Sequence, residues 1–484
     1  MQIVILLAFV ATYATLELPA PSWVGGWLTL PLIVAYLAGT ASITSAWTAA
    51  GLRHLEKFGP TDGKRPLGQA ALQALRLLWL VGGSVAVAYL GYARWLMQDA
   101  HLPGLGHAWP LGRWPLLGEL ALLVPFVLAL VLTWRLEYPY HRQVRARVAE
   151  AAPSEAPPFW TARQFLIFNL RHHLLFILAP VSLIVLGGDL IDLAYRAGWF
   201  GAGLTGEILS GVATIAVVGS VFLCAPLLIV RVWKTRPLER GPLRDRLEEM
   251  CRRLRLRCRN VLVWESGGVL ANAGAMGVIG PVRYVLLSDA LLERMPPEQI
   301  EAIFAHEAGH IVGHHIFFSG LFAIGSITLV QAAVESLAIP LQLDATTALA
   351  SAVAVLATVW ALGFGWISRR FERQSDVLAA WVMSRQLAPD PDMVGDRVTP
   401  QGARVFADAL EQVAILNGMS FRKFNWRHGS IAWRVNHILN LGARGGTVRQ
   451  IARVVTAIKL LLLTAAAGGI TWMVILYQST PEGI

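Results

Sequence analysis

Three residues between Pro297 and Gly313 have the types and spacing of a metal-dependent hydrolytic site. His306 and His310 lie four positions apart in the sequence HEAGH, which also supplies Glu307. A proline pair followed by acidic residues predicts that a helix begins at the prolines and continues through the histidines. On that helix the two imidazoles share one face and can bind a single zinc ion. Glu307 is rotated away from the metal and can act as a base toward a water molecule.

A tetrahedral catalytic zinc needs a third protein ligand and one open position. His314 continues the histidine stripe but lies a further turn along, about 6 Å from the second ligand. A third histidine at position 316 would fit a known metalloprotease spacing, but that residue is Ile316. Glu372 and Asp376, in the stretch SRRFERQSD, share a helix face. Glu372 could be the third ligand and Asp376 could accept a hydrogen bond from a ligating histidine, or both could belong to a solvated helix end.

The elements that must position these residues are those of a membrane protein. Of the 484 residues, 55% are hydrophobic and only 15% are charged, whereas soluble domains carry roughly a quarter charged residues. A helix needs about 20 mostly apolar residues to cross a bilayer. Nine stretches qualify or nearly so: Gln2–Glu17, Trp27–Ala49, Leu77–Leu96, Leu116–Trp134, Leu174–Leu190, Ile208–Val230, Ile316–Val334, Thr346–Ile367 and Leu460–Tyr477. We therefore predict a mainly α, polytopic helical membrane protein with about nine spans.

Positive charge is concentrated beside these apolar stretches. The net charge is +10, and the basic residues follow the positive-inside pattern, so anionic lipid headgroups rather than nucleic acid are the expected partner. The alternation predicts that Met1 lies inside and Ile484 outside, with the two long polar stretches in the cytoplasm. An arginine- and alanine-rich composition suggests a bacterial inner-membrane protein. Three cysteines lack the spacing of a disulfide framework or a zinc site and are expected to be reduced: Cys224, Cys251 and Cys258.

HEAGH, two following spans and then SRRFERQSD resemble the integral-membrane gluzincins. That family of zinc proteases includes the type I CAAX prenyl protease and the bacterial heat-shock membrane protease of the HtpX type. Its pattern pairs HExxH with a later SRxxExxxD, which Ser368, Arg369, Glu372 and Asp376 match position by position. Ser375 stands where the family usually has alanine. The resemblance implies that Glu372 is the third ligand of one zinc ion per chain, and that Asp376 supports the site.

Asn272 and Ala273 resemble a further segment of that family, an edge strand that pairs with the substrate backbone. They precede a predicted strand over Arg283–Ser288, and a peptide added to a sheet edge would present its carbonyl to the metal in a fixed register. An ordinary glycine-rich turn is the alternative.

The sequence HGSIAWR resembles a His-Pro-Ser…Arg segment of the family, with Gly429 in place of the proline. The resemblance implies that His428 and Arg434 lie near the active site, where they stabilise the oxyanion or fix the local structure. For Arg434, a hydrogen bond to a helix end is an equally good interpretation.

The predicted organisation has five parts: an N-terminal membrane domain of six spans over residues 1–230, a cytoplasmic part with HExxH over 231–315, two spans over 316–367, a cytoplasmic part with the third ligand over 368–459, and a last span and tail over 460–484. The two cytoplasmic parts together make an α+β gluzincin-type protease domain.

We therefore predict a membrane-embedded zinc endopeptidase with Glu307 as general base. The metal should lie about 10 Å from the start of the seventh span, so the expected substrates are membrane-associated, misfolded or lipid-tethered proteins. An intramembrane metalloprotease would need the motif within a span, and a zinc transporter would need histidine and aspartate in mid-membrane. A catalytically inactive scaffold or receptor on the same fold is the remaining alternative, although it would not need Glu307.

Overall fold

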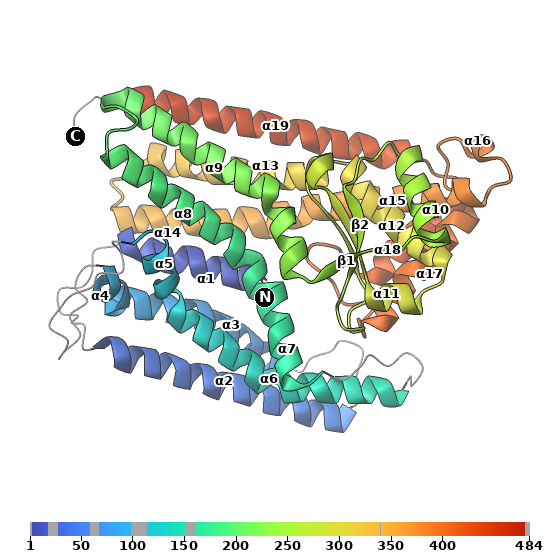
Figure 1. Ribbon diagram of the computed structural model, residues 1–484, viewed down its shortest axis with the longest axis horizontal. Helices are drawn as coiled ribbons and strands as arrows, with labels where there is room; N and C mark the ends of the chain where they lie inside the picture. Colours follow the sequence, from blue (N-terminus) through green and yellow to red (C-terminus); the bar gives the residue numbers. More distant parts are fainter. Residues whose placement is uncertain are drawn as a thin grey trace. The chain divides into compact units, whose positions relative to one another are not determined.

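The computed structural model describes residues 2–17, 28–58, 67–97, 114–151, 160–338 and 340–479. The chain forms two compact units, Met1–Lys234 and Thr235–Ile484, whose elements are drawn in Figure 1. Several residues used in the sequence predictions lie outside the described ranges: Met1, Trp27 and residues 480–484.

The first unit is helical throughout the part of it that the structure describes. Its helices are α1 (Gln2–Ala14), α2 (Thr29–Phe58), α3 (Leu67–Val87), α4 (Ala93–Met97), α5 (Leu117–Leu122), α6 (Val124–Ala151), α7 (Ala162–Asn169), α8 (Phe176–Arg196) and α9 (Gly203–Val232). A 3₁₀ helix, η1 (Thr15–Glu17), follows α1. Two π-helical segments, η3 (Ala88–Tyr92) and η6 (Leu170–Leu175), connect α3 to α4 and α7 to α8. Its core includes Phe126, Leu130 and Trp134 of α6. One buried ion pair joins Arg76 of α3 to Glu137 of α6 at 2.6 Å.

Seven helices among the described residues are long and apolar enough to cross a membrane. They are Thr29–Lys57, Gly68–Tyr92, Ala162–Arg196, Thr205–Val232, His315–Ala338, Ala350–Leu387 and Val448–Trp472. Each overlaps one of the nine predicted stretches. The predicted span Gln2–Glu17 contains the shorter helix α1, of 13 residues. The predicted span Leu116–Trp134 is divided between α5 and α6 at Leu123, which leaves neither piece with a long apolar run.

The second unit contains a small mixed sheet. Its strands are β1 (Thr235–Pro237), β2 (Asn260–Trp264), β3 (Ala273–Met276) and β4 (Tyr284–Ser288), in the spatial order β1-β2-β4-β3. Strands β2 and β4 are parallel, and the other two pairs are antiparallel. The predicted strand over Arg283–Ser288 is confirmed as β4, and β3 lies at an edge of the sheet.

The remaining elements of the second unit are helices. They are α10 (Pro242–Arg253), α11 (Asp289–Arg294), α12 (Pro297–Val312), α13 (His315–Ala338), α14 (Ala345–Val359), α15 (Gly365–Leu387), α16 (Pro391–Val394), α17 (Pro400–Leu416), α18 (Ile431–Ala443) and α19 (Val448–Ser479), with the turns η7 (Gly280–Val282) and η8 (Trp360–Phe364). Helices α13 and α19 run side by side, as Figure 1 shows.

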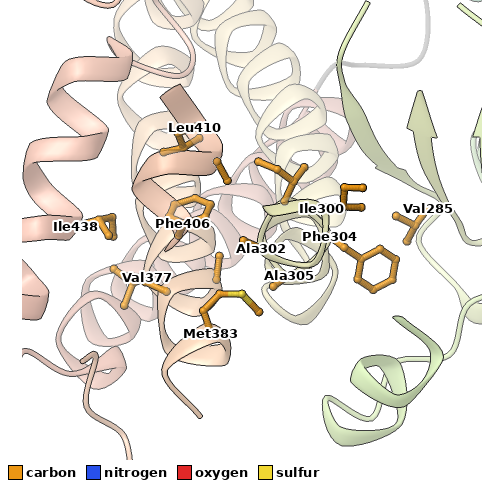
Figure 2. Close-up of a cluster of buried hydrophobic side chains, with 14 of the residues drawn as sticks. Val285, Ile300, Ala302, Phe304, Ala305, Val377, Met383, Phe406, Leu410 and Ile438 are labelled. Atoms are coloured by element: carbon orange, nitrogen blue, oxygen red, sulfur yellow. The ribbon is translucent and has the colours of Figure 1, made fainter. Parts of the chain in front are cut away.

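Helix α12 lies in the middle of the core of this unit. Phe304 of α12 lies next to Val285 of β4, and Phe406 of α17 and Val377 of α15 pack on its other side (Figure 2). Burial of such side chains stabilises a fold by about 1.5–3 kcal/mol each. Because α12 is covered on several sides, the histidines that it carries have a rigid backbone beneath them.

Candidate metal centre

Helix α12 carries the HEAGH motif, and its sequence explains both of its ends. Pro297 lies in the first turn, where a backbone N–H would have no partner within the helix, so its absence breaks no hydrogen bond. The negative charge of Glu298 in the same turn interacts favourably with the helix dipole. The helix ends at Val312, and His314 then adopts a left-handed conformation with φ of 51°.

Helix α15 brings Glu372 to the histidines because α12 and α15 approach closely. Gly309 and Ser375 form the contact: a Cβ atom added to Gly309 would lie 2.8 Å from the Ser375 Cα and 3.0 Å from its Oγ. A larger residue at either position would force the helices apart. The small residues of HEAGH and SRRFERQSD therefore help to set the ligand geometry.

Ligand atoms of His306, His310 and Glu372 converge on one point. The two Nε2 atoms are 3.2 Å apart, and Glu372 Oε2 and Oε1 lie 3.6 Å from His306 Nε2 and His310 Nε2 respectively. Zinc bonds of about 2.0–2.2 Å in a tetrahedron would separate ligand atoms by roughly 3.3–3.6 Å. The three residues also have the His₂Glu composition of catalytic zinc sites. The site therefore fits a zinc ion.

Asp376 and Arg434 support His306 from behind. Asp376 Oδ1 lies 3.0 Å from His306 Nδ1. Arg434 donates to both oxygens of Asp376, from Nε at 2.9 Å and from Nη2 at 2.6 Å, and its Nη1 is 3.4 Å from Glu372 Oε2. Ser430 caps the N-terminus of α18 by accepting from the Trp433 N–H, which places Arg434 in the first turn. Arg434 thus contacts two buried carboxylates, Asp376 and Glu372, which favours a part in fixing the local structure over a hydrogen bond to a helix end.

Burial and nearby charges shift the pKa values of both histidines of the candidate metal site. Burial lowers the pKa of His306, but the hydrogen bond and charge of Asp376 outweigh it and raise the net value above the ordinary one. The imidazole is therefore a better electron donor to a metal. Burial holds the pKa of His310 well below its ordinary value, which keeps this side chain neutral, as a ligand must be. Burial also lowers the pKa of Arg434, but Asp376 and Glu372 raise it overall, so the guanidinium stays charged.

Glu307 lies beside the metal point but does not join the ligand set. Its Oε2 accepts a hydrogen bond of 2.9 Å from the backbone N–H of Ala275 in β3. Burial raises the pKa of Glu307, and the Glu372 carboxylate raises it further, against the opposing charge of His306. A carboxylate with a raised pKa is better suited to accept a proton near neutral pH.

His428 reaches the site from the loop before α18. Its Nδ1 lies 2.8 Å from Glu372 Oε1, and 42% of its side chain is exposed. Asn425 Oδ1 accepts from the backbone N–H groups of Arg427 and His428, which shapes the turn. Trp426 anchors the loop by donating from Nε1 to Ala361 O at 2.6 Å. Position 429 has φ of 79°, a value that proline cannot adopt but glycine can.

The two predicted edge-strand residues, Asn272 and Ala273, differ in the direction of their backbone hydrogen-bonding groups. Asn272 uses its backbone within the sheet: its carbonyl accepts from Ser288 N–H, and its N–H donates to Ser288 Oγ. Ala275 directs its N–H away from β4, toward Glu307. Because alternate residues of an antiparallel strand face the same side, Ala273 also presents its backbone outward.

His315 and Gln374 were not predicted to contact the site. His315 Nδ1 lies 3.0 Å from His310 Nδ1, and His315 Nε2 lies 2.8 Å from Gln374 Oε1. His314, the alternative third ligand, is exposed and lies outside the cluster of ligand atoms found among the described residues.

Comparisons with known proteins agree with this geometry. Residues 237–440 match the family described as Peptidase family M48. The solved structure titled "Crystal Structure of S. mikatae Ste24p" resembles the chain with a TM-score of 0.51 and 15% identity, over 87% of this chain and 100% of that one. At that identity the likeness concerns the fold. A search of curated protein sequences gave no match.

Proposed function

The chain belongs to Peptidase family M48, and from this premise we propose that it hydrolyses peptide bonds of membrane-associated, misfolded or lipid-tethered proteins. The observation that carries the proposal is the convergence of three ligand atoms, all within 4.8 Å of one another, beside a half-buried glutamate, Glu307, that is not needed to hold the metal. A binding protein or receptor would have no use for that glutamate.

His306, His310 and Glu372 would hold the zinc ion, whose chemistry is that of a Lewis acid that activates water and polarises a carbonyl. Glu307 would take the proton of the attacking water and deliver it to the leaving amine. His428 is exposed beside Glu372 and would stabilise the developing oxyanion. Asp376 and Arg434 would keep the ligands in place.

The substrate would add as a strand to the outward edge of β3. Ala273 would pair with the substrate backbone, and Asn272 would hold the end of the strand through its bonds to Ser288. Such pairing would bring a scissile carbonyl into a fixed register beside Glu307, because Ala275 of the same edge contacts Glu307 directly.

The membrane helices support the proposed class of substrates. Helix α13 begins three residues after α12 ends, and α15 continues from a candidate span. The site would therefore lie close to the bilayer. We also propose a bacterial inner-membrane location, from the arginine- and alanine-rich composition, and a cytoplasmic site, from the positive-inside pattern.

The decisive test compares wild type with Glu307→Gln in the purified full-length protein. We expect one zinc ion per chain in both, and chelator-sensitive cleavage of an unfolded membrane protein in wild type alone. Cleavage by the variant would contradict the role of Glu307. Zinc binding without cleavage in wild type would favour the scaffold.

A further inference from the structure

His310 is contacted from behind by a chain of two neutral groups. Its Nδ1 lies 3.0 Å from His315 Nδ1, and His315 Nε2 lies 2.8 Å from Gln374 Oε1. His315 is only 3% exposed and is stacked on Phe371, with the ring centroids 4.3 Å apart and the planes 1° from parallel. The hydrogen-bonded chain of His310, His315 and Gln374 therefore has little freedom to rearrange.

The hydrogen bonds along this chain can run in only two directions. A neutral imidazole has one N–H donor and one acceptor nitrogen. If Gln374 presents its oxygen, His315 donates from Nε2, its Nδ1 accepts from His310 Nδ1–H, and His310 Nε2 keeps a free lone pair. If Gln374 presents its NH₂ group, each direction reverses and His310 Nε2 carries the hydrogen. Only the first arrangement leaves Nε2, the atom nearest Glu372, able to bind a metal.

We propose that Gln374 and His315 are positioning residues that hold His310 in the Nδ1–H tautomer and thereby set the zinc affinity of the site. The inference rests on the proposed function only in that the same three residues hold the metal. It concerns the second histidine, whereas Asp376 and Arg434 act on the first.

The backbone at Gly313 and His314 explains how His315 reaches His310. In a continuous helix a residue five positions on points about 140° away. The left-handed His314, with φ of 51°, separates α12 from α13 and turns His315 back toward His310. Gly313 leaves the space for it, because a Cβ there would collide with the His315 ring.

The two histidines are thus oriented by groups of different charge. Asp376 orients His306 as an anion, balanced by Arg434. A second carboxylate behind His310 would add negative charge to a site that already contains Glu307 and Glu372. A His–Gln chain fixes the tautomer without that added charge.

The test measures zinc affinity by chelator competition on the purified full-length protein. Removing a group that orients a ligand typically weakens metal binding 10–100-fold, so we expect that loss for Gln374→Leu. Gln374→Glu keeps an acceptor oxygen and should restore affinity to within about threefold of wild type. The matched control is Gln331→Leu on α13, where the exposed Gln331 side chain donates to Glu335; this variant should bind zinc as wild type does.

A double variant separates the tautomer from simple charge attraction. His315→Phe keeps the stack on Phe371 but removes both hydrogen bonds, so Gln374→Glu should not restore affinity in that background. The visible spectrum of the cobalt-loaded protein gives a second readout, and we expect it to change in Gln374→Leu but not in Gln374→Glu.

Three results would overturn the proposal: wild-type affinity in Gln374→Leu, affinity in Gln374→Glu as weak as in Gln374→Leu, or restoration by Gln374→Glu without His315. If the Gln374→Leu protein fails to fold, two comparisons stay decisive: Gln374→Glu against wild type, and His315→Phe with and without Gln374→Glu. Because zinc affinity is measured without substrate, failure here is distinct from an absence of cleavage.

Discussion

Replacing Gly309 by alanine tests whether the contact between α12 and α15 sets the ligand geometry. The added Cβ would lie 2.8 Å from the Ser375 Cα and 3.0 Å from its Cβ and Oγ, far inside ordinary contact distance. Two of these atoms belong to a small side chain, but the Cα is backbone, so a rotamer change cannot relieve the clash. Overpacking of this kind costs about 1–3 kcal/mol.

The strain should appear mainly as lost zinc affinity. The helices can relieve it by moving apart, but this increases the 3.6 Å separations between Glu372 and the two histidines. If zinc binding must restore the close approach, 1–3 kcal/mol corresponds to an affinity about 5- to 150-fold lower. Chelator competition on the purified protein measures this change.

The matched control is Gly468→Ala in α19, where an added Cβ has nothing within 4 Å. It should bind zinc as wild type does. Ser375→Gly combined with Gly309→Ala removes the Cβ and Oγ contacts and should recover part of the loss. If Gly309→Ala alone bound zinc with wild-type affinity, the close approach would not set the geometry and the reasoning would be refuted.

Three further predictions follow from the same contacts. Glu372→Ala should lose the zinc ion that wild type keeps through dialysis, measured by metal analysis; retention would mean that another residue completes the ligand set. Arg434→Leu removes the charge partner of buried Asp376, which keeps only its contact with His306, and should lower the free energy of unfolding by about 3–5 kcal/mol. Arg449→Leu, at an ion pair whose arginine is 77% exposed, should cost less than about 1 kcal/mol; equal effects would contradict the role proposed for Arg434. Free zinc at a hundredfold excess over Kd should raise the stability of the metal-free protein by about 2.7 kcal/mol, and no thermal shift would exclude specific binding.

The part of the candidate metal site that lies on α12 could be predicted because the spacing of its residues is local. His306, Glu307 and His310 lie on one helix, and periodicity alone relates their directions. Glu372 is distant in sequence, and its residue pattern alone favoured a solvated helix end. The resemblance to a known family, not the residue pattern, identified it as a candidate ligand.

The contacts behind the ligands could not be predicted, because they depend on backbone that departs from regular geometry. His315 contacts His310 only because His314 adopts a left-handed conformation, which is uncommon for residues other than glycine. The nine predicted spans show both what apolar length can predict and what it cannot. Apolar length identified the seven long helices, but it could not show that the stretch beginning at Leu116 breaks at Leu123.

The placement of the third ligand connects the site to the membrane helices. Glu372 lies in α15, which continues through η8 from the apolar helix α14, and α15 also packs against α19. The histidines lie on α12, which is followed by the candidate span α13. The separation of Glu372 from His306 and His310 therefore depends on how the spans of this unit pack against one another, as well as on the contact between Gly309 and Ser375. A rearrangement of those spans by even a few tenths of an ångström would change the 3.6 Å ligand separations, so the packing of the bilayer helices and the affinity for the metal should vary together.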